Sequence, residues 1–135
     1  FSVRGAIEFA KAVAPFRPLF IEEPTWRETP QALGEVALHS PVALAGGEGL
    51  VSRYEFKHLL DARGARIVQP DVIHCGGITE IRRIASLAEV YEEHRAIFAA
   101  IRTGDAEAAR TAMHDHLETS RARLFDGHDF DLSRA

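Results

Sequence analysis

The segment FIEEPT, residues 20–25, predicts a short buried strand that ends at a functional rim. The apolar run Leu19-Phe20-Ile21 leads directly into two carboxylates, Glu22 and Glu23, and Pro24 then stops the strand, which is expected over 19–22. An apolar run that delivers acids and ends abruptly is typical of a buried strand whose last residues face solvent or a site.

The same layout recurs twice along the chain. VALAGGE (42–48) runs apolar residues into Glu48, and RIVQPD (66–71) runs them into Asp71. Three short strands that each end in an acid predict a cluster of carboxylates along one edge of a parallel sheet.

The segments beside these strands have helical periodicity and candidate caps at Thr29, Ser52 and Thr79. Strand–helix alternation with short loops predicts parallel strands and right-handed crossovers. We therefore expect an α/β fold, a partial (β/α)8 barrel of about three parallel strands with helices, in which functional groups lie at the C-terminal ends of the strands.

The pattern changes after Tyr91. Residues 92–104 continue as helix, Gly104 ends that helix, and Asp105 can cap another. We expect a C-terminal helical hairpin and a fraying polar tail at 126–135. The predicted domains are residues 1–91 and 92–135, as if two sequences were joined near Tyr91.

Composition excludes several classes of function. The chain has 135 residues and a net charge of −4, which gives no electrostatic reason to expect nucleic acid or an anionic membrane as partner. No apolar run approaches the roughly 20 residues that span a bilayer, and the first residues do not resemble a signal peptide. The single Cys75 fits a reducing compartment, so we expect a cytoplasmic protein.

Carboxylates at three adjacent strand ends form a hard-oxygen site suited to Mg²⁺. Such an ion can hold a substrate carboxylate and stabilise the enediolate that forms when the α-proton is removed. A single acid at a strand end is more often a solvated loop residue. Three in register, one of them between glycines, favour the metal site.

The motifs FIEEPT, ALAGGE, IVQPDVIHCGGITE and IASLAEVY together resemble the enolase superfamily, closest to its mandelate racemase subgroup and to galactonate dehydratase-like enzymes. The resemblance covers about residues 1–91. It implies a sugar-acid substrate, Glu22 and Glu48 as two of three Mg²⁺ ligands, and Asp71 as the aspartate of an Asp–His dyad.

Four residues near these acids have less specific roles, and two of them, Arg53 and His74, have two interpretations each. Glu23 is expected to help order the site, and Arg53 is either a substrate contact or a surface residue at a helix start. His74 is a candidate substrate-binding residue, with a polar loop residue as the alternative. Cys75 is expected to pack inside the protein, because no base is placed to activate it.

The chain also departs from that family. The third metal ligand, the general base, the dyad histidine and the capping domain have no counterpart in these residues. We therefore expect weak Mg²⁺ binding and no activity from these residues alone, because each missing group costs orders of magnitude in rate.

Residues 93–120 resemble the last two helices of the FCD ligand-binding domain of GntR-type transcription regulators. That resemblance implies a second metal site at His94 and His116, whereas His114 is expected to face solvent. Surface histidines between two helices are the alternative. Because the winged DNA-binding domain of those regulators has no counterpart here, DNA binding is not expected.

Three hypotheses follow. The chain is a fragment of a Mg²⁺-dependent acid-sugar dehydratase, an FCD-like effector or dimerisation module, or a chimera without activity. In each case the open edges of a three-stranded sheet favour self-association.

Overall fold

The structure, a computed structural model, describes residues 1–26 and 29–125. The expected tail at 126–135 lies outside the described residues. The chain divides into two compact units, Phe1–Ala88 and Glu89–Ala135. Helix α4 (Ile78–Thr103) contributes residues to both, and each unit is described by itself.

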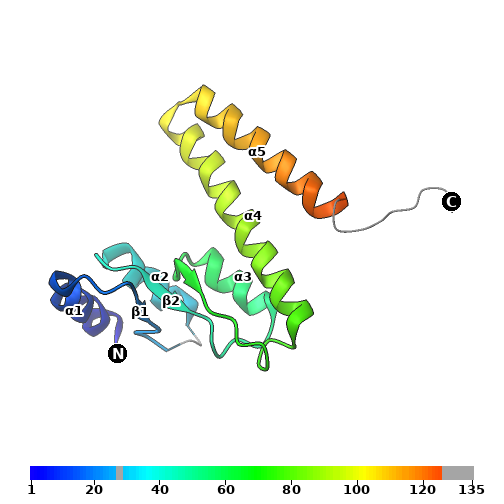
Figure 1. The fold of residues 1–135 in the computed structure, drawn as a ribbon. Coiled ribbons are helices and arrows are strands. Elements are labelled where there is room, and N and C mark those ends of the chain that lie inside the picture. The colour runs from blue at the N-terminus through cyan, green and yellow to red at the C-terminus, as the bar shows by residue number, and fades with distance from the viewer. Residues whose placement is uncertain (27–28, 126–135) are drawn as a thin grey trace. The chain divides into compact units, whose positions relative to one another are not determined.

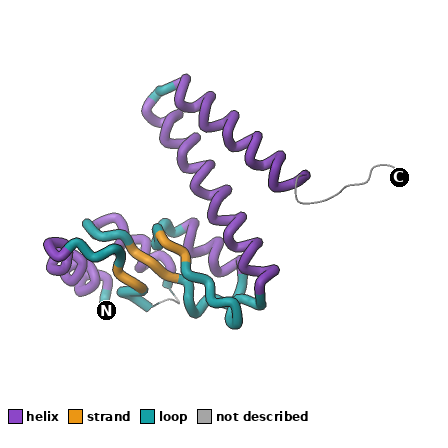
Figure 2. Tube along the Cα trace, viewed as in Figure 1, coloured by secondary structure: helices purple, strands orange, loops and turns teal. Residues whose placement is uncertain are grey.

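The first unit alternates helices and strands, as Figures 1 and 2 show. Its elements before α4 are α1 (Val3–Val13), the 3-10 helix η1 (Ala14–Phe16), β1 (Ile21–Glu22), α2 (Pro30–His39), β2 (Leu44–Gly46), α3 (Arg53–Asp61) and β3 (Ile67–Val68). The three strands form one parallel sheet in the order β1-β2-β3. This confirms the predicted α/β class with three parallel strands.

The strands are shorter than the sequence suggests. Ile21 pairs with Leu44 and Ala45 pairs with Ile67, but pairing extends only two or three residues on each strand. Leu19, expected inside the first strand, is 82% exposed. The apolar run in the sequence therefore overestimates the length of β1, whose buried part begins only at Ile21.

Side-chain caps define some helix starts and not others. Ser52 and Glu55 form a reciprocal capping box at α3, which confirms the expected cap. Helix α2 begins at Pro30 as expected, but the Thr29 side chain makes no capping hydrogen bond. Thr79 lies inside α4, which begins one residue earlier, so its expected capping role is wrong.

The core lies among the helices and one face of the sheet. Helix α2 packs against both α1 and α3, and the largest fully buried side chains are Phe56, Ile84, Val36 and Cys75. Cys75 is 1% exposed and belongs to this cluster, as expected for a packing residue.

Glycine permits the closest approach between α2 and α3. A Cβ at Gly34 would overlap the carbonyl oxygen of Ala62, where α3 ends. Gly64 is also tight, because a Cβ there would lie 3.1 Å from the Leu33 Cβ. The α2–α3 contact therefore requires glycine at position 34, whereas a side chain at position 64 would need small shifts of its neighbours.

The second unit is a helical hairpin. The end of α4 is followed by Gly104, whose φ of +73° reverses the chain, and by α5 (Ala106–Phe125). Asp105 accepts a hydrogen bond from the Ala108 amide at 2.9 Å, which confirms it as the cap of the second helix.

One carboxylate joins the two helices of the hairpin. Glu93 accepts two hydrogen bonds from Arg123, at 2.7 and 2.8 Å, and contacts His116 Nδ1 at 2.7 Å. The Glu93 and Arg123 side chains are only about one-fifth exposed. The Arg123 hydrogen bonds, aided by His116, lower the pKa of Glu93 from 4.5 to about 2.

Replacing Gly34 by alanine tests the α2–α3 packing. The added methyl group clashes with the Ala62 carbonyl, and overpacking of this kind costs about 1–3 kcal/mol. We expect the free energy of unfolding, measured by urea titration, to fall by that amount. Gly5→Ala is the matched control, because its Cβ would meet only side-chain atoms among its three nearest neighbours, the Ser2 hydroxyl at 3.3 Å and Phe1 carbons at 3.8 and 3.9 Å. Equal stability of the two variants would contradict the packing account.

The Glu93 interaction predicts an acid-dependent loss of hairpin stability. Because the folded pKa lies below the ordinary value, the stabilisation is present above about pH 4.5 and is lost as the pH falls toward 2. Helicity at 222 nm should therefore melt at lower temperature across this range. Glu93→Gln removes this contribution, so the wild-type minus variant difference should vanish near pH 2. A difference independent of pH would refute this assignment.

Candidate functional site

The C-terminal ends of the three strands meet at one edge of the sheet, because all three run in the same direction. Glu22 ends β1, Glu48 follows β2 by two residues, and Asp71 follows β3 by three residues. The strand directions thus bring the loops that carry the predicted acids to the same edge.

The adjacent carboxylates Glu22 and Glu23 face different surroundings. Ile21 is buried in the core and side chains alternate along a strand, so Glu22 projects to the opposite face, where it is exposed. Glu23 has a left-handed φ of +34°, and its carboxylate accepts a hydrogen bond from the Gly47 amide at 2.8 Å. Glu23 therefore ties the end of β1 to the loop after β2.

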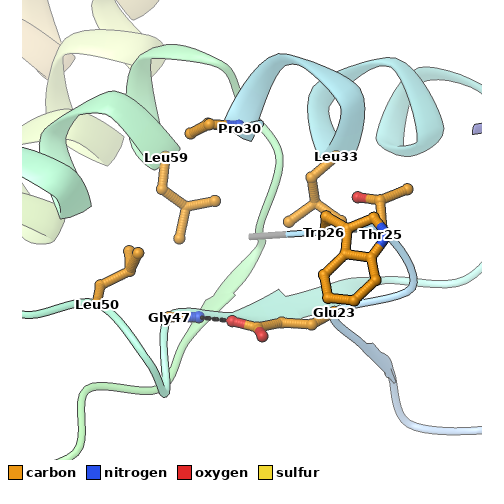
Figure 3. Close-up of a pocket in the computed structure, with 8 residues that line it drawn as sticks. All are labelled: Glu23, Thr25, Trp26, Pro30, Leu33, Gly47, Leu50 and Leu59. Atoms are coloured by element: carbon orange, nitrogen blue, oxygen red, sulfur yellow. Dashed lines mark hydrogen bonds between the residues drawn. The ribbon is translucent and has the colours of Figure 1, made fainter. Parts of the chain in front are cut away.

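Glu23 forms one wall of a small, mainly apolar pocket on the helix side of this edge (Figure 3). The pocket is lined by Glu23, Thr25, Trp26, Pro30, Leu33, Gly47, Leu50 and Leu59. Thr25 is 7% exposed, and its hydroxyl has no hydrogen-bond partner within the described residues. Nothing in the sequence pattern indicated this buried hydroxyl.

Glu48 lies in a glycine loop with little room beneath it. Gly47 has a φ of +115°, and a Cβ there would lie 2.6 Å from Cε1 of the fully buried Phe56. The Leu50 amide donates to the Gly47 carbonyl at 3.1 Å, which closes the turn. Glu48 itself is exposed.

Asp71 organises the loop after β3. Its Oδ1 accepts hydrogen bonds from the amides of Ile73, at 2.7 Å, and His74, at 3.0 Å. These backbone hydrogen bonds, the one from His74 first, lower the pKa of Asp71 below its ordinary value. The carboxylate is therefore ionised at neutral pH.

His74 reaches from this loop to the loop after β2. Its Nδ1 lies 3.2 Å from the carbonyl oxygen of Glu48. Because a carbonyl can only accept, Nδ1 donates in this contact. No sequence pattern indicates this contact, since His74 and Glu48 are 26 residues apart.

Arg53 has a partner within the fold. Its Nε lies 3.1 Å from Glu80, which also pairs with Arg83 at 3.2 Å. Arg53 is the first residue of α3 and links this helix to the first turn of α4, whereas its contact with substrate stays a prediction.

The metal-ligand set that these residues provide is incomplete. Within residues 1–26 and 29–125, no three or more His, Cys, Asp or Glu side chains are grouped closely enough to hold a metal ion. Glu22 and Glu48 supply the hard oxygens that Mg²⁺ prefers, but two carboxylates do not complete its coordination.

The hairpin brings together the two histidines that the sequence singled out. The rings of His94 and His116 are 4.7 Å apart between centroids, tilted by 56°. His114 is 74% exposed, as expected for a solvent-facing residue. Whether the pair binds a metal stays a prediction.

No helix in the described part of the chain is long and apolar enough to cross a membrane.

Comparison with known proteins identifies the family. The family model described as enolase C-terminal domain-like matches residues 1–129. D-galactonate dehydratase of Ralstonia pickettii is 46% identical over 82 residues, which cover 61% of this chain and 22% of that enzyme. The D-galactonate dehydratase of Cronobacter sakazakii matches to the same extent.

Solved structures show the same relationship. An enolase from Agrobacterium radiobacter, bound to Na and L-malate, superposes with a TM-score of 0.65 at 44% identity over 67% of this chain and 23% of its own. L-Talarate dehydratase from Polaromonas, complexed with Mg and L-glucarate, gives a TM-score of 0.65 at 33% identity over 68% of this chain and 26% of its own.

The chain thus spans about a quarter or less of these relatives. The match of the family model over almost its whole length, together with the parallel sheet and its strand-end acids, shows that this chain belongs to the enolase C-terminal domain-like family.

Proposed function

We propose that these residues form part of the site of a Mg²⁺-dependent acid-sugar dehydratase of the galactonate type. Glu22 and Glu48 are the metal ligands, Asp71 is the aspartate of an Asp–His dyad, and His74 contacts substrate. The observation that carries the proposal is the placement of Glu22, Glu48 and Asp71 at the C-terminal edge of one parallel sheet. The dehydratases among the relatives support it.

The chemistry assigns each residue a limited task. When bound, Mg²⁺ would supply Lewis-acid stabilisation of the charge that develops as the α-proton of the sugar acid is removed. Asp71, kept ionised by two backbone amides, would hold and polarise a histidine. His74 would offer Nε2 to a substrate hydroxyl, because Nδ1 donates to the Glu48 carbonyl.

These residues alone would not turn over substrate. Of the groups that the reaction needs, they lack a third carboxylate grouped with Glu22 and Glu48. The expected general base and dyad histidine are also without a counterpart in the sequence. We propose a boundary near residue 91, which is supported by the division into compact units between Ala88 and Glu89. A cytoplasmic location and self-association through the outer edges of β1 and β3 belong to the same proposal.

Calorimetry and turnover assays test this function together. We expect Mg²⁺ to bind weakly to the wild-type chain and at least about tenfold more weakly to Glu22→Gln or Glu48→Gln, because each loses one charged ligand. Glu8→Ala, an exposed change in α1, should bind as wild type. No dehydration of a panel of sugar acids is expected. Turnover that depends on Glu22, Glu48 and Asp71 would contradict the proposed lack of activity.

The hairpin supports a second candidate function, an FCD-like effector-binding or dimerisation module, and with it a chimeric origin of the chain. The observation that favours it is the 4.7 Å separation of the His94 and His116 rings across the two helices. Imidazole pairs of this kind suit Zn²⁺, Ni²⁺ or Cu²⁺ better than Mg²⁺. Glu93 is bonded to His116 at 2.7 Å and also to Arg123. Because no group of three such ligands forms within the described residues, the two imidazoles would have to share the ion with solvent.

Metal titration of single histidine variants tests the hairpin. We expect Zn²⁺ to raise the melting temperature of the wild-type chain and to have no such effect on His94→Ala or His116→Ala, because each removes one of two ligands. His114→Ala is the matched control, since its side chain is exposed on the same helix. An equal Zn²⁺ effect on all three variants would refute the site.

A further inference from the structure

The Gly47–Glu48 segment is held on both sides by side chains from the neighbouring strand ends. Glu23, after β1, accepts from the Gly47 amide, and His74, after β3, contacts the Glu48 carbonyl. We propose that Glu23 and His74 are positioning residues that fix the direction of the Glu48 carboxylate. This inference rests on the proposed function of Glu48 as a metal ligand.

The Glu23 side of the arrangement is itself anchored. The Glu23 amide donates to the Ala45 carbonyl at 3.0 Å, which continues the β1–β2 pairing one residue beyond the strand. The left-handed φ of Glu23 then places its carboxylate 2.8 Å from the Gly47 amide. A hydrogen bond from an amide to an ionised carboxylate is about twice as strong as a neutral one, so this contact fixes one end of the segment.

The His74 side depends on Asp71. Because Asp71 Oδ1 accepts from the His74 amide at 3.0 Å, the backbone of the β3 loop is folded into a tight turn. That turn places Nδ1 of the His74 ring 3.2 Å from the Glu48 carbonyl. Asp71 therefore acts on Glu48 through His74, in addition to its proposed role in the dyad.

Packing beneath the loop further limits the conformations of its backbone. Phe56 is fully buried directly beneath Gly47, where no Cβ can be accommodated. The turn between Gly47 and Leu50 limits the segment on its other side. The Leu50 amide binds the Gly47 carbonyl and His74 binds the Glu48 carbonyl, so both peptide groups that flank Glu48 are hydrogen-bonded. Glu23 holds the preceding peptide group through the Gly47 amide, and together these contacts restrict the direction in which the Glu48 side chain leaves the loop.

Amide hydrogen exchange tests this arrangement without any metal. In the whole chain, Glu23→Ala and His74→Ala should each speed exchange at residues 47–50 by about tenfold, as expected for loss of one such hydrogen bond. Glu23→Gln keeps an acceptor and His74→Asn keeps a donor near the Nδ1 position, so both should exchange within about threefold of wild type. Glu23→Met, which keeps the length of the side chain without an acceptor, replaces Glu23→Ala if that variant does not fold.

Glu22→Gln is the matched control, because Glu22 adjoins Glu23 but projects to the other face of the sheet. It should leave exchange at 47–50 unchanged and weaken Mn²⁺ binding, measured by paramagnetic relaxation of water. Glu23→Ala and His74→Ala should instead both speed exchange at residues 47–50 and weaken Mn²⁺ binding.

The two measurements separate the two claims. Unchanged exchange in both alanine variants, or equal acceleration in the conservative and alanine variants, overturns the positioning role even where Mn²⁺ binds. Absence of Mn²⁺ binding to the wild-type chain overturns the proposed metal function, whereas the predicted exchange pattern would still support the fixed loop.

Discussion

Parallel pairing of β2 with both of its neighbours is the constraint on which the candidate site depends. The hydrogen-bonded register aligns Glu22 with Ala45 and Gly46 with Val68. All three carboxyl ends therefore leave the sheet at the same edge, and the loops that follow must lie next to one another. Helices α2 and α3, which approach each other closely at Gly34 and Ala62, supply part of the core around this small sheet.

Hydrogen bonds between the loops at the strand ends further fix the position of the loop after β2. Two contacts join the loop after β2 to the ends of its neighbours. The Gly47 amide donates to Glu23, after β1, and His74, after β3, contacts the Glu48 carbonyl. Both involve backbone groups of the β2 loop, so the acid that the loop carries is not used in holding it. Glu48 is left exposed and free to bind a ligand, which is the property expected of a metal-binding carboxylate.

The sequence was informative wherever the pattern is local. Apolar runs ending in acids predicted three strands of a parallel sheet, and the candidate cap Ser52 marked the start of α3. The sequence was less informative where tertiary contacts determine a residue's exposure or its partner. The exposure of Leu19 depends on how far β1 pairs with its neighbour, and the contact of His74 with Glu48 depends on two loops meeting across 26 residues. Neither the exposure of Leu19 nor the contact between His74 and Glu48 can be read from periodicity or propensity.

The central claim is that the strand-end acids are the preserved part of a divalent-metal site. The most direct test is an anomalous difference map from crystals of the chain soaked with Mn²⁺, which replaces Mg²⁺ and scatters anomalously. If Glu22 and Glu48 hold a divalent ion, a peak should lie beside their carboxylates, at the C-terminal edge of β1 and β2. A peak confined to the His94–His116 pair, or no peak near either carboxylate in crystals that hold Mn²⁺ elsewhere, would contradict it.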